Sequence, residues 1–461
     1  MLPEDVLLAI FDFFVDEVQS TNRGIEAWQL LVHVSRRWRS VVFGSPRRLN
    51  LRLVCTPQTP TRTTQDVWPP LPLLIQGDVL NPSCADNIIA VLEKRSNHMF
   101  RIDLDVQGPQ WKKVSAKMRG PFPELTDLQL LTRFTNKQSE SMAVVPDSFL
   151  GGCVPRLQKL YFHAIPFPGL PKLLLSAPHL VDLHLSSIPS SGYISPEAIV
   201  TALSTSTSLQ SLWLQFQSPR SFPDWRSRPL PPSTRTIFSA LIELRFKGFS
   251  FYLDDLVAHI DTPRFNKLYI TFFNEVEFDT TQFTKFIGRT PRFRALEKAC
   301  VTFECRVASV NISSETSGYG EPPGELNVNI SSRDLDWQVS CLEEVCISCV
   351  PLLPALETLY ISEYSRPNWK NDNENMLLVG LLHPFTAVKN LYLSEKIARR
   401  IVPALQELVG VRATEVLPAL QNIFLEEGQR SGPVQEGIQQ VVAVRQATDH
   451  PIAVSYKRSV L

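Results

Sequence analysis

The chain has 461 residues, a length that suits two to three domains or one long array of repeats. Its 46 basic and 46 acidic residues balance, so no global field attracts nucleic acid or an anionic membrane, and we expect neither as a partner. Eight sparse cysteines and the lack of an apolar run long enough to span a bilayer predict reduced thiols and a cytoplasmic or nuclear protein.

The first predicted helix carries more apolar surface than a helix packed on one side needs. It opens in the stretch LPEDVLLAIFDFFV, residues 2–15. Pro3 suits a first helical turn, and Glu4 and Asp5 favour the positive end of the helix dipole. One apolar stripe follows helical spacing and comprises Leu7, Ile10, Phe11, Phe14 and Val18. Further apolar residues lie outside it, namely Val6, Leu8, Phe13 and Val15.

Two more short helices are predicted at 25–34 and 36–46. Ser35 is a candidate cap for the second of these, which Gly44 and Pro46 end. Three short helices form a very small core, so the surplus apolar surface indicates a partner-binding face. The alternative is a helical cap on the downstream array. In that case Leu2, Pro3, Val6 and Phe13 are expected to be buried against the first strands.

The N-terminal segments LPEDVLLAIFDFF and WQLLVHVSRRWRSVV resemble an F-box. The resemblance implies docking on the Skp-type adaptor, and through it the cullin, of an SCF (cullin-RING) ubiquitin ligase. It implies these adaptor-binding positions: Leu2, Pro3, Val6, Leu7, Ile10, Phe11, Leu30, Leu31, Val34, Trp38 and Val42.

Residues 47–98 are predicted to be a junction that contains the first strands. Strand candidates at 49–55 and 71–77 flank a Thr/Pro-rich loop. We expect them to begin the sheet and to cover the first open edge of the array.

From residue 99 the pattern apolar-x-x-apolar-x-apolar recurs twelve times, separated by helical patterns. The copies start at residues 99, 125, 157, 180, 209, 241, 265, 296, 342, 356, 388 and 420. The helical patterns lie at 169–178, 196–207, 252–263, 279–291, 375–385 and 396–410, and a C-terminal helix and strand are predicted at 434–446 and 451–456. The copy at 342 starts 46 residues after the preceding copy and 14 residues before the next one. This uneven spacing predicts an inserted hairpin built from 325–330 and 334–340.

This pattern predicts an α/β fold, in which a short N-terminal three-helix F-box is followed by a leucine-rich-repeat-like solenoid of alternating helices and parallel strands. The tail of the chain, in segments such as LETLYISEY and LPALQNIFLE, resembles the large F-box family of mushroom-forming fungi. The expected domains are an F-box-like module at 1–46, the junction at 47–98 and an irregular solenoid with a C-terminal cap at 99–461.

One residue of each strand motif is predicted to point outward on the concave face, because strand side chains alternate. The candidate target-binding residues on that face are Tyr161, His184, Trp213, Arg245, Tyr269, Tyr360, Tyr392 and Phe424. Tyr, Trp and Arg are favoured anchors of protein interfaces. Cross-strand packing is the alternative explanation, because aromatic residues are favoured in strands in any case.

No catalytic or cofactor motif stands in a fitting context, and the histidines are scattered singly. The run CLEEVCISC at 341–349 lacks the paired spacing and the histidines of a metal site. We therefore expect no enzyme, cofactor or metal. The resulting hypothesis is a substrate-receptor subunit of an SCF ubiquitin ligase, whose solenoid binds an unknown target protein. The alternative is a leucine-rich-repeat interaction scaffold without a ligase role.

Overall fold

The computed structural model describes most of the chain, in two compact units. The described residues are 2–19, 27–46, 49, 51–58, 71–133, 144–146, 148–167, 170–219, 234–273, 280–314, 325–332, 335–348, 350–363, 374–408, 414–426 and 432–457. One unit comprises Met1–Ile194 and Ala202–Leu209, and the other comprises Ser195–Thr201 and Gln210–Leu461. Among the described residues, no helix is long and apolar enough to cross a membrane.

Three helices pack together at the start of the first unit. They are α1 (Glu4–Gln19), α2 (Ala27–Val34) and α3 (Arg36–Gly44). The Ser35 side chain accepts a hydrogen bond from the Trp38 backbone N–H at 3.1 Å, which confirms the predicted cap. Trp28 is buried and its Nε1 donates to the Arg52 carbonyl at 3.0 Å, so α2 is tied to the chain just before the first strand.

The first unit continues as parallel strands separated mainly by helices. The strands, in sheet order, are β1 (Leu53–Cys55), β2 (Leu73–Val79), β3 (Met99–Gln107), β4 (Asp127–Arg133), β5 (Lys159–His163) and β6 (Asp182–Ile188). The helices are α5 (Pro82–Arg95), η1 (Ser96–His98), α6 (Gly108–Lys117), η2 (Phe149–Gly152), α7 (Leu170–Leu175) and η3 (Ser190–Gly192). The junction supplies β1 and β2 as predicted, whereas α5 and α6 were not predicted from the sequence.

The second unit repeats the same scheme, with one interruption. Its strands, in sheet order, are β7 (Ser211–Phe216), β9 (Glu243–Gly248), β11 (Lys267–Phe272), β14 (Leu326–Ser331), β13 (Val307–Ser313), β12 (Lys298–Phe303), β15 (Thr358–Glu363), β16 (Asn390–Leu393), β17 (Asn422–Glu426) and β18 (Ala453–Lys457). A separate two-stranded parallel sheet pairs β8 (Thr236–Ile237) with β10 (Ile260–Asp261).

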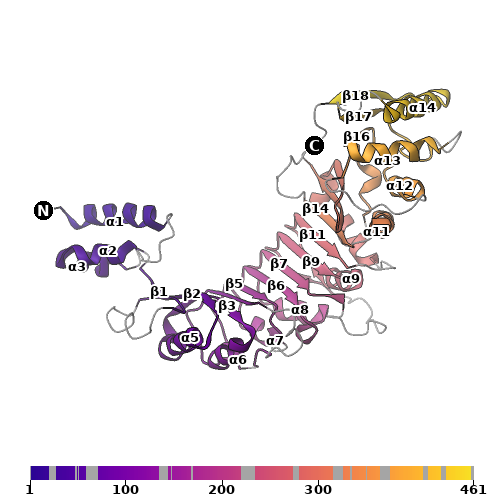
Figure 1. The fold of residues 1–461 in the computed structure, drawn as a ribbon. Helices are drawn as coiled ribbons and strands as arrows, with labels where there is room; N and C mark the ends of the chain where they lie inside the picture. The colour runs from indigo at the N-terminus through magenta and orange to yellow at the C-terminus, as the bar shows by residue number, and fades with distance from the viewer. Residues whose placement is uncertain are drawn as a thin grey trace. The chain divides into compact units, whose positions relative to one another are not determined.

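The helices of the second unit follow their strands along one side of the sheet, which is plain for α11 to α13 (Figure 1). They are α9 (Ser250–Ala258), α10 (Thr281–Arg289), η5 (Pro291–Ala295), α11 (Leu335–Ser348), η6 (Leu353–Ala355), α12 (Glu374–Leu382), α13 (Glu395–Gln406) and α14 (Pro433–Ala447). Helix α8 (Pro196–Leu203) has residues in both units.

The repeated apolar positions build the core. In the copy at 157, for example, Leu157, Leu160 and Phe162 are all essentially inaccessible, whereas Tyr161 between them is half-buried. Strand side chains alternate, so the motif's leucines face the helix layer and the intervening residue faces the opposite, outer face of the sheet. Eleven of the twelve motif copies coincide with a strand, which confirms the prediction of alternating strands and helices.

The twelfth copy, at 342, is a helix, so the prediction of a strand there is wrong. Helix α11 spans this copy and buries Leu342 and Val345 at helical spacing. An insertion is present, but its strands are β13 and β14, and the segment 334–340 lies largely in α11 instead. Because β12 pairs with β13 and β13 with β14, both antiparallel, the hairpin lies between β11 and β12 in the sheet.

Candidate functional site

Two surfaces carry the residues singled out in the sequence, and the first is the N-terminal module of α1, α2 and α3. Its interior is closed by apolar side chains that share near-zero exposure, namely Leu7, Leu8, Phe11, Trp28, Leu31, Val32, Val41 and Val42. The Phe11 and Trp38 rings lie 4.8 Å apart, and the Trp28 and Phe43 rings lie 6.0 Å apart. The module therefore has a small aromatic core of its own.

The same module exposes an unusual amount of apolar surface. Of the eleven large apolar side chains that are exposed among the described residues, six belong to residues 2–34, so the exposure is concentrated here. These six are between 43% and 72% exposed and are Leu2, Val6, Ile10, Phe13, Leu30 and Val34. Pro3 is exposed as well. Isolated exposed apolar residues need no explanation, but a concentration of them is typical of an interaction site.

Helical spacing places these residues in stripes. Val6, Ile10 and Phe13 lie one turn apart along α1, in line with Leu2 ahead of the helix. Leu30 and Val34 lie one turn apart on α2, which packs against α1. The guanidinium of Arg37, on α3, donates a hydrogen bond to the Leu2 carbonyl and so holds the segment before α1 against α3. Both α1 and α2 therefore carry exposed apolar side chains.

The eleven predicted adaptor-binding residues thus separate into a surface set and a core set. Leu2, Pro3, Val6, Ile10, Leu30 and Val34 are exposed, and Trp38 is half-buried against Phe11. Leu7, Phe11, Leu31 and Val42 are at most 5% exposed, so they shape the module and cannot touch a partner directly. The sequence-based list also left out Phe13, the most exposed of all. Its spacing from Ile10 on the helix was the signal that could have identified it.

The second surface is the face of the sheet opposite the helices, which carries the residues that the sequence predicted for a concave face. It is called the outer face of the sheet here. In the first unit, Gln129, Tyr161 and His184 are aligned on neighbouring strands, and the Tyr161 and His184 rings meet edge to face at 4.2 Å. His163 lies on the next outward position of β5, and its Nδ1 is 2.9 Å from the Ser186 Oγ. Burial lowers the pKa of His163 below its ordinary value, although the nearby Asp105 acts in the opposite direction.

In the second unit, Arg245 lies between two aromatic rings. Its guanidinium carbon is 4.0 Å from the Trp213 ring centre and 4.5 Å from that of Tyr269, and register places these residues on neighbouring strands. Arg245 also forms an ion pair with Glu243 on its own strand. Burial and Glu243 raise the pKa of the Tyr269 hydroxyl, whereas Arg245 acts in the opposite direction. This arrangement holds the guanidinium in place by cation–π contacts and a charged hydrogen bond.

A second group, on β15 to β18, forms a continuous stack. The Tyr360 and Tyr392 rings lie 4.3 Å apart and nearly parallel, and Tyr392 and Phe424 repeat this geometry. The Lys457 ammonium lies 4.4 Å from the Phe424 ring centre and 4.8 Å from that of Tyr392. Burial and the neighbouring Tyr392 raise the pKa of Tyr360 to about 12. Lys457 is a member of this group that sequence analysis did not include.

The predicted row is therefore interrupted rather than continuous. The inserted hairpin brings Asn327 and Asn311 between Tyr269 and Cys300, which in turn neighbours Tyr360. All eight predicted target-binding residues are half-buried. Cross-strand packing accounts for the ring contacts described above, and target recognition by these residues stays a prediction.

The described cysteines and acidic residues hold no metal-binding cluster. Cys55, Cys84, Cys341 and Cys346 are buried, and none of the cysteines that the structure describes is in a disulfide. Cys341 and Cys346 lie on α11, while Cys349 falls outside the described residues. No group of three or more His, Cys, Asp or Glu side chains suited to a metal occurs within the described ranges.

No family model matches the sequence, and no curated protein matches it. Among solved structures, the chain is similar to the leucine-rich repeat-containing protein LegL7 from Legionella pneumophila, at 13% identity and a TM-score of 0.27, over 85% of this chain and 97% of that one. The architecture itself defines a strand–helix repeat protein of the leucine-rich type.

Proposed function

We propose that the chain is the substrate-receptor subunit of an SCF-type (cullin-RING) ubiquitin ligase. The observation that carries this proposal is the concentration of exposed apolar side chains on α1 and α2, in a module whose own core is already closed. These side chains are Leu2, Val6, Ile10 and Phe13, called here the apolar stripe of α1, together with Leu30 and Val34 of α2. A helical cap on the repeats would instead bury Leu2, Pro3, Val6 and Phe13 against the first strands, and all four are exposed.

In this function the N-terminal module docks on a Skp-type adaptor, and the outer face of the sheet holds a target protein. The chain makes and breaks no bonds and needs no cofactor or metal. It raises the effective concentration of target lysines near the conjugating enzyme. The aromatic groups around Arg245 and Tyr392 are the proposed anchors for the target, because rigid aromatic and arginine side chains supply most interface energy. A cytoplasmic or nuclear site of action fits a protein in which none of the described cysteines is in a disulfide.

The proposal is tested by titrating the full chain with a purified Skp-type adaptor in a calorimeter. The informative variant is Ile10→Asp, which puts a carboxylate in the centre of the stripe at a site 45% exposed. We expect wild type to bind and Ile10→Asp to bind at least about tenfold more weakly. The matched control is Ile237→Asp, the same change at another exposed isoleucine, on β8 in the second unit, and it should bind like wild type.

A second candidate function is a repeat scaffold that binds proteins without any ligase role. The half-buried aromatic groups on the outer face of the sheet favour it equally, because they do not depend on the N-terminal module. A folded wild-type chain that fails to bind the adaptor would leave this candidate and exclude the ligase role.

A further inference from the structure

The guanidinium of Arg245, on the outer face of the second unit, is held in place but keeps one edge open. The rings of Trp213 and Tyr269 lie against it, and its Nε donates to Glu243. Its terminal nitrogens form no hydrogen bond or ion pair with any residue that the structure describes, and its side chain is 36% exposed. A guanidinium binds a carboxylate through two parallel N–H groups, and one already fixed in place loses little freedom on binding. The open edge is therefore suited to a carboxylate from another molecule.

Two lysines extend this site on the same face of the sheet. Lys247 lies two residues after Arg245 on β9, and Lys267 lies on β11 beside Glu243. Because strand side chains alternate, both lysines are on the same side of the sheet as Arg245. Lys247 is half-buried and Lys267 is exposed, and neither forms an ion pair with another described residue. Arg245, Lys247 and Lys267 are called here the Arg245 cluster.

The carboxylates that this chain itself places near the cluster are already paired with arginines. Glu243 pairs with Arg245. Glu325 stands just before β14, next to β11 in the sheet, and its carboxylate accepts hydrogen bonds from Arg292 at 3.1 Å and from the Ser314 hydroxyl at 2.8 Å. The two arginines balance the two glutamates, so the lysines leave this part of the outer face with a net positive charge.

The spacing of the three cations matches an extended peptide. Arg245 and Lys247 are alternate residues of one strand, about 6.7 Å apart along it. Lys267 is offset from Arg245 by two positions on the neighbouring strand, and such diagonal neighbours are about 7–8 Å apart. Alternate side chains of a second extended chain have nearly the same spacing as these cations. The arrangement therefore suits several separated carboxylates better than one compact dianion.

We propose that the Arg245 cluster binds an extended acidic segment of the target protein, with Asp or Glu on alternate residues. One carboxylate pairs with the open edge of Arg245, and the carboxylates on either side of it pair with Lys247 and Lys267. The inference rests on the proposed function only in taking the outer face of the sheet as the target-binding surface. The adaptor has no part in it, so the two can be tested separately.

Fluorescence anisotropy of labelled synthetic peptides, titrated with the full chain, tests the proposal. The first peptide has three glutamates separated by single threonines. The second has the same composition, but two threonines separate each pair of glutamates. Low ionic strength is used because salt screens exposed charges. We expect the first peptide to bind at least about tenfold more tightly than the second. Equal binding of both peptides, or no binding of the first, would overturn the proposal.

Variants of the chain locate the binding site. Arg245→Gln and Lys267→Gln should each weaken binding of the first peptide at least about tenfold, because each removes one cation of the cluster. Lys298→Gln is the matched control and should bind like wild type. Lys298 lies on the same face of the sheet, but β12 is three strand spacings from β11, about 14 Å away. Unchanged binding by Arg245→Gln and Lys267→Gln would contradict the assignment.

A third peptide, with one phosphoserine in place of the three glutamates, distinguishes carboxylate from phosphate recognition. If it binds more tightly than the first peptide, the site is a phosphate site and the proposal is overturned. If a variant is misfolded by circular dichroism, the comparison of the first two peptides on the wild-type chain decides. A wild type that binds the adaptor but not the first peptide would refute this inference and leave the ligase role. The reverse result would refute the ligase role alone.

Discussion

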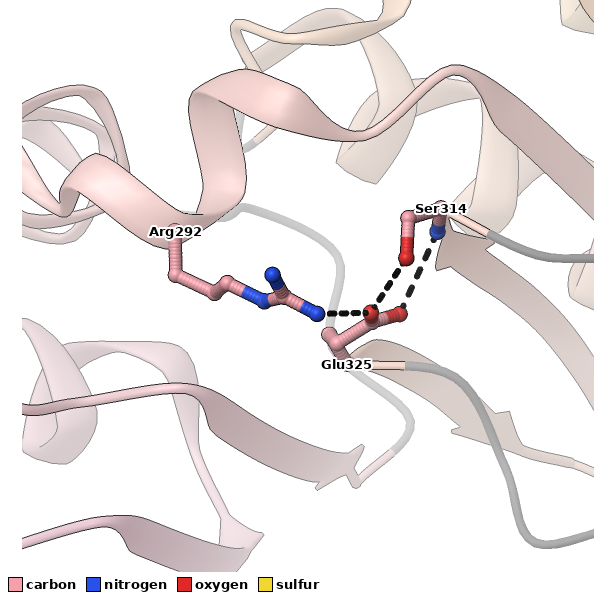
Figure 2. A network of polar contacts seen from close by, with 3 residues as sticks. All are labelled: Arg292, Ser314 and Glu325. Carbon is pink, nitrogen blue, oxygen red and sulfur yellow. Dashed lines mark hydrogen bonds and ion pairs between the residues drawn. The ribbon is translucent and has the colours of Figure 1, made fainter.

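Glu325 joins the inserted hairpin to the helical side of the repeat, as Figure 2 shows. One carboxylate oxygen accepts hydrogen bonds from the Ser314 hydroxyl at 2.8 Å and from Arg292 Nη2 at 3.1 Å, and the other accepts from the Ser314 backbone N–H at 3.4 Å. Burial alone would raise the pKa of Glu325. The bonds from Ser314 and from its own backbone, together with Arg292, outweigh burial and lower the pKa below its ordinary 4.5.

The substitution Glu325→Gln should lower the free energy of unfolding by about 1 kcal/mol at neutral pH, because it keeps the shape and removes the charge. A carboxylate with a depressed pKa stabilises the folded state above its unfolded pKa and loses that effect as pH falls. The difference between variant and wild type should therefore shrink as pH falls below 4.5. Urea unfolding at a series of pH values measures it. A difference that stays constant or grows on acidification would contradict this assignment.

At the scale of elements, helix α1 contributes some side chains to the core of the N-terminal module and others to its exposed surface. Phe11 and Phe13 are two residues apart on α1, so they point to different sides. Phe11 is fully buried against Trp38, whereas Phe13 is 72% exposed. The first holds the module together, and the second belongs to the stripe proposed for the adaptor.

This division predicts opposite outcomes for two alanine variants. Phe11→Ala removes a buried ring, at a cost of about 3–5 kcal/mol, which three short helices cannot absorb. Phe13→Ala should change stability by less than about 0.5 kcal/mol, as is usual at the surface. Hydrogen exchange of the amides in α1 to α3 separates the two, with fast exchange expected only for Phe11→Ala. Equal exchange in both variants would show that the module's core is not where the structure places it.

The sequence predicted most elements because the repeat motif encodes them directly. The prediction failed at α11, because the segment LEEVCI at 342–347 fits both helical and strand periodicity. Leu342 and Val345 are three residues apart, as on one face of a helix, whereas Val345 and Ile347 are two apart, as on one face of a strand. The structure buries the first pair and leaves Ile347 58% exposed, which a core strand would not do. The preceding buried Val339 extends the helical spacing and was the missing clue.

The residues of the candidate site could be predicted from the sequence, but which of them are buried and which are exposed could not. Sequence spacing located the apolar surplus on α1, yet it could not separate Leu7, which is buried, from Ile10, which is exposed. That separation depends on how α2 and α3 pack, a tertiary property. Similarly, the aromatic row was identified on the correct strands, but the hairpin that interrupts it sets Tyr269 apart from Tyr360.

At the scale of the whole molecule, strands and helices repeat along the chain, and successive repeats place their strands side by side in the sheet. Such proteins offer long surfaces for binding and gain stability from adjacent repeats. Here the repeats carry half-buried aromatic groups on the outer face, and the helical module carries the exposed apolar stripe. We therefore propose that the module docks on the adaptor and that the sheet binds the target.

The most direct test of this account is hydrogen–deuterium exchange on the full chain, with and without a Skp-type adaptor. We expect the adaptor to slow exchange in α1 and α2, where the exposed apolar side chains lie, and to leave exchange in β15, β16 and β17 unchanged. Protection confined to the strands, or no change in α1 and α2 under conditions in which the adaptor is in excess, would contradict the assignment of docking to the N-terminal module.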